Sequence, residues 1–155
     1  MRLYLIQHGE PVPGAVDPAK PLSPKGIVDV GKTAALMMRV GVGIKTVFHS
    51  HKTRSVQTAR ILAAAMGPGC ALIQREDLSP NDPIDTIFKE ISVRDDDTAI
   101  VGHQPFLSKL ASKLLLGRED KDLVEFKQGG VICLARQGGT WKVQWAITPD
   151  LVRKE

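Results

Sequence analysis

The sequence has few cysteines, few aromatic residues and no long apolar run, and each shortage narrows what the chain can be. Cys70 and Cys133 are far apart and form no Cys-x-x-Cys pair, so we expect no disulfide framework and no cysteine metal site, but buried thiols in a reducing compartment. The four apolar residues at 3–6 are too few for a signal-peptide core, and no later stretch approaches the length of a membrane span. We therefore expect a cytoplasmic protein without a membrane partner.

A block of positive charge is also lacking. The formal net charge is +4, and the Lys and Arg residues are scattered along the chain without interleaved aromatic residues. A nucleic-acid groove needs a concentrated basic patch, so we expect no nucleic-acid partner and favour a local anion site. With 155 residues, 43% of them hydrophobic and 25% charged, the composition is that of one globular domain covering residues 1–155.

Strand-like apolar segments alternate with helical segments along the chain. The spacing of apolar residues predicts strands at 3–6, 44–50, 71–73 and 98–101, and helices at 24–38, 53–66, 84–93 and 106–115. Two further strands, 130–136 and 140–148, are separated by Gln137-Gly138-Gly139 and predict a C-terminal β-hairpin. The alternation predicts an α/β fold, a three-layer α/β/α sandwich with a mostly parallel central sheet.

Two of these strands run directly into a histidine at a glycine-marked turn. His8 stands in Gln7-His8-Gly9 after the first strand, and His103 follows Gly102 after the strand at 98–101. In α/β sheets ligands bind outside the carboxyl ends of the strands, so the two imidazoles can face one pocket. The strand that ends at Ser50 leads to Arg54, which adds a guanidinium at the same edge. Two imidazoles and an arginine at one sheet edge indicate phosphate chemistry.

The same residues also have structural interpretations. A single histidine at a strand end is more often a hydrogen-bonded surface or core residue than a catalyst, and Arg54 taken alone fits a solvated helix position. His49 and His51 form a His-x-His pair, but no carboxylate or histidine at ligand spacing completes a metal site, so no metal is expected. We expect His49 to be partly buried on its strand and His51 to lie at the pocket rim. Glu10 fits a loop carboxylate and a proton-transfer group equally well.

Five short segments occur in an order known from one superfamily of enzymes. They are residues 7–10, 20–26, 50–59, 101–105, and 126–130 together with 145–149. Together they resemble the motifs of the histidine phosphatase superfamily, also called phosphoglycerate mutase-like, and within it the small SixA-type phosphohistidine phosphatases. One such segment is a weak signal, but five in order, spread over nearly the whole chain, are a specific one.

The resemblance implies a metal-independent phosphatase without a cofactor. His8 would be the nucleophile that carries the phosphoryl group as a covalent phosphohistidine, with its attacking nitrogen unprotonated. Arg54 and His103 would bind the phosphoryl oxygens and stabilise the transition state, and Gln7 and Lys20 would complete the phosphate site. The implied partner is a protein that bears phosphohistidine, such as a phosphotransfer domain, and phosphate is the product.

The chain departs from the superfamily's pattern in three places. Gln7 stands where the signature arginine is expected, which removes a full charge and a bidentate donor. Lys20 stands where the small phosphatases have arginine, which keeps the charge and loses the planar fork. No segment clearly matches the acidic proton donor of the larger sugar-phosphate phosphatases, although four carboxylates lie in about the right stretch: Glu76, Asp77, Asp82 and Asp85.

The weak match to an acid bears on the substrate. A phosphate ester must expel an alkoxide and needs acid assistance, whereas phosphohistidine expels an imidazole whose conjugate acid has a pKa of about 6.5. The chain also lacks a large insertion that would form a lid over a small metabolite. The sequence therefore favours a phosphohistidine phosphatase. Two alternatives stay open: a phospho-ligand binding or regulatory module weakened by Gln7, and a phosphatase for small phosphate esters with an acid in the 76–85 stretch.

Overall fold

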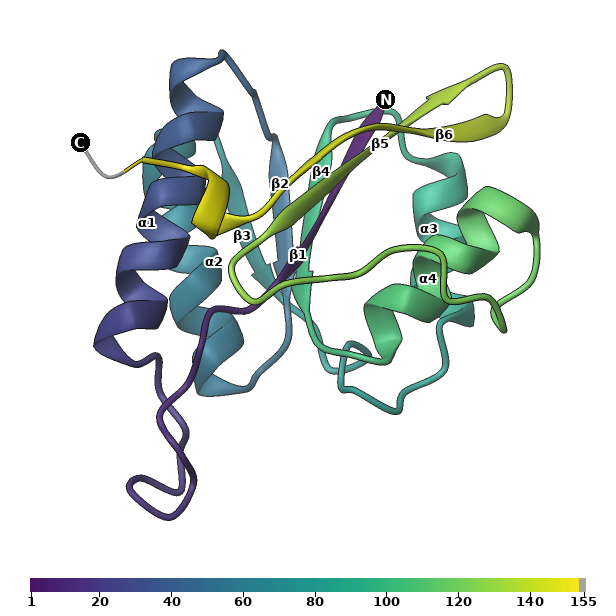
Figure 1. Ribbon diagram of the computed structural model, residues 1–155. Helices are drawn as coiled ribbons and strands as arrows, with labels where there is room; N and C mark the ends of the chain where they lie inside the picture. Colours follow the sequence, from purple (N-terminus) through teal and green to yellow (C-terminus); the bar gives the residue numbers. More distant parts are fainter. Residues whose placement is uncertain (154–155) are drawn as a thin grey trace.

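The computed structural model describes residues 1–153, in which strands and helices alternate (Figure 1). The strands are β1 (Arg2–Gln7), β2 (Thr46–His49), β3 (Ala71–Gln74), β4 (Thr98–Gly102), β5 (Val131–Gln137) and β6 (Thr140–Ile147). The helices are α1 (Pro24–Arg39), α2 (Thr53–Met66), α3 (Asp85–Val93) and α4 (Phe106–Leu116), with a 3₁₀ turn at Pro149–Leu151.

The six strands form one sheet in the order β3-β2-β4-β1-β5-β6. β1, β2, β3 and β4 are mutually parallel, whereas β5 is antiparallel to both β1 and β6. Gly138 and Gly139 join β5 to β6 with φ of 57° and 78°, a left-handed conformation that glycine adopts without strain. The predicted α/β class, the mostly parallel sheet and the C-terminal hairpin are confirmed.

Helices cover both faces of the sheet, with α1 and α2 on one side and α3 and α4 on the other (Figure 1). The side chains of β1 alternate between the two cores: Leu3 and Leu5 pack with α3 and α4, and Tyr4 and Ile6 pack with α1 and α2. All four are buried. A strand covered by helices on both faces must carry apolar side chains on both faces. This explains why residues 3–6 of β1 form a continuous apolar run.

Local interactions account for where the elements begin and end. Ser23 caps α1, because its hydroxyl accepts a hydrogen bond from the Gly26 amide at 3.0 Å, and Pro24 occupies the first turn. The strand predicted at 44–50 is shorter in the structure. Ser50 donates its amide to the Ser55 hydroxyl at 3.1 Å instead of to a neighbouring strand, so β2 ends at His49.

The two cysteines differ in burial. Cys133 is fully buried on β5, as predicted, but Cys70 is only partly buried because it precedes β3, the strand at the edge of the sheet. Among residues 1–153, no helix combines the length and the apolar character needed to span a membrane.

Candidate active site

The site is assembled by the carboxyl ends of three adjacent parallel strands. β4 lies between β1 and β2, and Gln7 at the end of β1 is in register with Gly102 at the end of β4. The residues that follow these strands, His8 after β1, His103 after β4 and Ser50 after β2, therefore emerge side by side at one edge of the sheet.

His8 and His103 come together at this edge. Their ring centroids are 5.0 Å apart with an angle of 52° between the ring planes, and the residues are only 7% and 2% exposed. At this separation both imidazoles lie within reach of a single phosphate-sized anion. The structure thus brings together the two histidines that the strand ends singled out.

The hydrogen bonds of His8 indicate which nitrogen carries its proton. Nδ1 lies 2.7 Å from the Gly9 carbonyl oxygen, which can only accept, so Nδ1 is the protonated nitrogen and the neutral ring keeps its lone pair on Nε2. Burial lowers the pKa of His8, the Gly9 hydrogen bond opposes this shift, and the charge of Arg54 lowers the pKa further. A neutral imidazole with a free Nε2 is the form that can attack phosphorus.

The His103 ring is held by a buried serine. Its Nε2 is 2.6 Å from Ser50 Oγ, and Ser50 has no exposed surface. Burial, the largest cause, together with His8, Arg54 and other neighbouring positive groups, lowers the pKa of His103 to about 3. Without a bound anion His103 is therefore neutral near pH 7. A phosphate dianion beside the ring would favour its protonated form, because opposite charge stabilises the cation.

Arg54 and Lys52 supply positive charge at the start of α2. Arg54 is partly buried in the first turn, and its charge lowers the pKa of both His8 and His103. Lys52 also lowers the pKa of His103, although the sequence did not single it out. The helix N-terminus adds its own partial positive charge, so this corner of the site suits an anion.

Gln7 brings an unpaired polar atom to the site. Within residues 1–153 two buried side-chain atoms lack a hydrogen-bond partner, Gln7 Oε1 and His103 Nδ1, and both belong to this edge of the sheet. Most buried polar atoms in folded proteins are paired, and exceptions need an explanation such as a functional role. Whether Gln7 contacts phosphate stays a prediction.

Lys20 contacts a glycine of its own loop. It is exposed on the loop after β1, with φ of +48°, and a Cβ added to Gly14 would lie 2.9 Å from Lys20 Cε. The carbons of the Lys20 side chain thus lie against Gly14 of the same loop. Its role as a phosphate ligand also stays a prediction.

Most of the candidate acids have other partners. Ser23 donates its hydroxyl to Glu10 at 2.6 Å, so Glu10 connects the loop after β1 to the cap of α1. Arg75 holds Asp77 through two hydrogen bonds of 2.8 Å, and Asp82 accepts the Ser79 amide at 2.8 Å. These three carboxylates serve local structure.

Glu76 has a different environment. Its Oε2 lies 3.4 Å from Nδ1 of His51, whose charge also acts on His103. The His51 side chain is about half exposed, and its place at a pocket rim stays a prediction, whereas His49 is buried and not partly buried as expected. Among residues 1–153, no three histidine, cysteine, aspartate or glutamate side chains are grouped so that they could hold a metal ion.

One face of α2 joins the site to the segments around it. Thr58 Oγ1 accepts the Gly9 amide at 3.0 Å, and Gln57 Oε1 accepts the Leu22 amide at 2.6 Å. Arg54, Gln57 and Thr58 are three and four residues apart, a spacing that places them on one side of a helix. All three residues belong to the motif at 50–59, but the sequence analysis assigned a role to Arg54 alone. The helical spacing was the signal that could have identified Gln57 and Thr58.

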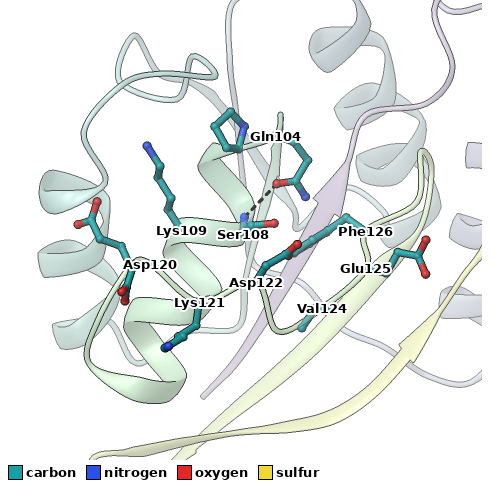
Figure 2. Close-up of a pocket in the computed structure, with 11 residues that line it drawn as sticks. Gln104, Ser108, Lys109, Asp120, Lys121, Asp122, Val124, Glu125 and Phe126 are labelled. Atoms are coloured by element: carbon teal, nitrogen blue, oxygen red, sulfur yellow. Dashed lines mark hydrogen bonds between the residues drawn. The ribbon is translucent and has the colours of Figure 1, made fainter.

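A groove of about 450 Å³ lies against α4 (Figure 2), and its lining includes Gln104 and Pro105, which follow His103 in the chain. It runs from Gln104 and Pro105 between α4 and the segment at 119–126, and the Ser108 amide donates to Gln104 Oε1 at 3.1 Å. Its lining carries both signs of charge, including Lys109 and Asp122.

No family model matches the chain. An uncharacterized protein from Picosynechococcus sp. is 29% identical to it over 152 residues, which is 93% of this chain and 89% of the relative. Among solved structures, the protein histidine phosphatase SixA complexed with tungstate superimposes with a TM-score of 0.85 at 17% identity, covering 97% of this chain and 98% of the other.

Two further structures have the same fold at low sequence identity. The α-ribazole phosphatase from Shigella flexneri has a TM-score of 0.76 at 18% identity, with 100% of both chains covered. Phosphoserine phosphatase from Entamoeba histolytica, in complex with 3-phosphoglyceric acid, has a TM-score of 0.65 at 16% identity and covers 94% of this chain and 95% of its own. The shared feature is the fold, since the substrates that these proteins are named for differ.

Proposed function

We propose that this chain, which has the fold of the histidine phosphatase superfamily, is a phosphatase that removes the phosphoryl group from phosphohistidine on a protein. The observation that carries the proposal is the pair of buried, neutral imidazoles 5.0 Å apart, one of which has its Nε2 lone pair free. The positive charge at the start of α2 lies beside this pair, where the oxygens of a phosphoryl group need it.

The reaction has two displacements at phosphorus. In the first, His8 Nε2 forms a bond to phosphorus, the bond from phosphorus to the substrate imidazole breaks, and that imidazole takes up a proton from solvent. In the second, water attacks the phosphohistidine at His8, loses a proton to solvent, and releases phosphate while the electron pair returns to Nε2. Dividing one displacement into two lowers the barrier of each.

The neighbouring groups stabilise charge in both steps. Arg54 offers a planar fork of donors that matches phosphoryl oxygens, and Lys52 adds a second positive charge. His103, whose Nε2 is bonded to Ser50, would take a proton as negative charge approaches and then donate to a phosphoryl oxygen. Ser50 acts here as a positioning residue, because it orients the ring and does not itself supply charge.

The surroundings of the carboxylates support a phosphoramidate as the substrate. Glu10, Asp77 and Asp82 are held by Ser23, Arg75 and the Ser79 amide. Strong acid assistance is needed for an alkoxide leaving group and is much less necessary for an imidazole. A small phosphate ester is the second candidate substrate, because the contact between Glu76 and His51 at the rim provides one possible proton source.

The test compares a protein phosphorylated on histidine with a panel of phosphate esters. We expect the phosphoprotein to be hydrolysed with the higher kcat/KM and a radioactive phosphoryl group to be trapped on His8. The His8→Gln variant should lose both, since it removes the nucleophile. His49→Gln is a matched control, because His49 is also buried, at the last position of the parallel strand β2, and its Nδ1 also bonds a backbone carbonyl, at 2.8 Å. Normal turnover by a folded His8→Gln protein would refute the mechanism.

A further inference from the structure

A projecting arm, residues 11–22, follows the nucleophile strand. A bridge between Pro11 and Leu22 closes its base, and the Val12 amide donates to the Pro21 carbonyl at 2.7 Å. In Figure 1 the arm extends away from the body of the molecule beyond the end of β1 and below α1. It thus stands at the same edge of the sheet as His8.

The arm is internally ordered. The Val16 and Asp17 amides both donate to the Pro13 carbonyl, at 2.9 and 3.1 Å, and the Lys20 amide donates to the Asp17 carbonyl at 3.0 Å. The Asp17 carboxylate also accepts the Ala19 amide at 3.0 Å. Four prolines, at positions 11, 13, 18 and 21, restrict the backbone further. An element fixed in this way loses little conformational entropy when it binds a partner.

The outer part of this ordered arm is apolar. Val16 is 75% exposed, and its exposed neighbours are Pro13, Ala15, Pro18 and Ala19. Exposed apolar patches on a soluble protein mark interaction sites when they are contiguous. Charge is scarce on the arm, since Asp17 and Lys20 are its only ionisable residues, so its outer part suits an apolar partner surface better than a charged one.

The base of the arm is tied to the site. Leu22 donates its amide to Gln57 at 2.6 Å, on the α2 face that also carries Arg54, and the Ser23 amide donates to the Glu10 carbonyl at 2.8 Å. The outer part extends away from the body of the molecule (Figure 1), and half of the arm, six residues at about 3.3 Å each, would span at most roughly 20 Å if fully extended. A small phosphorylated molecule held at His8 does not reach that far, but a protein does.

We propose that the arm is a docking element for the protein that carries the phosphohistidine. Val16 and its apolar neighbours pack on an apolar patch of that protein next to the modified histidine, while the phosphoryl group enters the site at His8. This inference rests on the proposed function and adds how the substrate protein is recognised. The occupant is the substrate because the arm and the phosphate site share one edge of the molecule and one supporting helix, α2.

The test uses substrates of two sizes. Val16→Asp should lower kcat/KM about tenfold on a phosphotransfer domain phosphorylated at histidine, mainly through KM, and should leave hydrolysis of p-nitrophenyl phosphate unchanged. Val93→Asp is the matched control, since Val93 is 79% exposed at the end of α3, before β4 begins and therefore at the opposite edge of the sheet. This variant should keep wild-type activity on both substrates.

The other outcomes of this experiment distinguish a failure of the docking role from a failure of the proposed function. Equal kcat/KM of wild type and Val16→Asp on the phosphoprotein would overturn the docking role alone. A loss of the same size on p-nitrophenyl phosphate would also overturn it, because the arm would then act on the site itself. A wild-type dimer that Val16→Asp converts to a monomer would assign the arm to self-association. Wild type that hydrolyses p-nitrophenyl phosphate but not the phosphoprotein would refute the proposed function and the docking role together.

Discussion

At the scale of single residues, Gln7 is the position where this chain departs most from the motif that its neighbours His8 and Gly9 follow. Its buried Oε1 lacks a hydrogen-bond partner within residues 1–153, and its backbone carbonyl accepts the Gly129 amide at 2.9 Å. The backbone is thus firmly held while the side-chain oxygen is unpaired. A residue in this situation can be exchanged without loss of an existing side-chain bond from that oxygen.

We predict that Gln7→Arg strengthens phosphate binding. A charge-assisted bidentate contact is worth roughly 1.5 to 3 kcal/mol, or about one to two decades in affinity or rate. The added cation should also lower the pKa of His8 further, which moves the acid limb of the pH profile of kcat/KM to lower pH. Phosphate inhibition and pH profiles of the two proteins measure both effects.

The direction of the kinetic change distinguishes two explanations. A faster kcat would mean that the wild-type pocket lacks transition-state stabilisation, whereas tighter phosphate binding at constant kcat would mean uniform binding. If neither the inhibition nor the pH profile changes, Gln7 does not face the phosphate.

Single residues also show how much of the candidate site could be predicted from the sequence alone. His8 and His103 were predictable because a strand that ends in a histidine delivers that side chain to a known edge of an α/β sheet. Ser50 and Lys52 were not assigned, because their contribution depends on a neighbour more than fifty positions away in the chain, at His103. Lys20 was assigned from its motif alone, and the fold of its own loop around Gly14 could not be read from that motif.

At the scale of elements, α2 connects most parts of the site. Its first turn supplies Arg54, and Thr58 Oγ1, which is fully buried, donates to the Arg54 carbonyl at 2.8 Å and accepts the Gly9 amide at 3.0 Å. The turn after the nucleophile is therefore attached directly to the helix that carries the main cation.

We predict that Thr58→Val destabilises the protein by about 1 to 3 kcal/mol, because valine fills the same space but leaves the buried Gly9 amide without an acceptor. Urea unfolding measures the loss. Thr86→Val, at an exposed position of α3, should have little effect in the same assay. A loss below roughly 0.5 kcal/mol for Thr58→Val would show that water replaces the hydroxyl and that the bond is not needed.

The elements themselves were largely predictable, but their arrangement was not. Helical periodicity and cap residues placed α1, α2, α3 and α4 within a residue or two of their observed ends. The order β3-β2-β4-β1-β5-β6 depends on contacts between strands that are distant in the chain, and no local pattern encodes those contacts.

At the scale of the whole molecule, the buried histidines link stability to pH. In the unfolded chain a histidine binds a proton below about pH 6.5, whereas burial lowers the pKa of folded His103 to about 3. Between these values the unfolded state binds more protons, so the free energy of unfolding falls as the pH is lowered through this window. His8, with its pKa also lowered by burial, contributes in the same direction.

We predict that wild type loses about 2 kcal/mol more stability between pH 7 and pH 5 than His103→Gln does. The variant lacks the titrating ring at 103, while the other titrating groups, including His8, are present in both proteins. Urea unfolding at the two pH values measures the difference. An equal loss in both proteins would mean that His103 is protonated in the folded state near its usual pKa.

The position of β1 between β4 and β5 determines when during synthesis this strand can pair with its neighbours. β1 lies between β4 and β5, whose residues follow it in the chain by about a hundred positions or more. During synthesis β1 leaves the ribosome long before either neighbour exists, and contacts between such distant segments form slowly. Until then both edges of this apolar strand are open to other chains. The strand that precedes His8 is thus synthesised before both of the strands that pair with it.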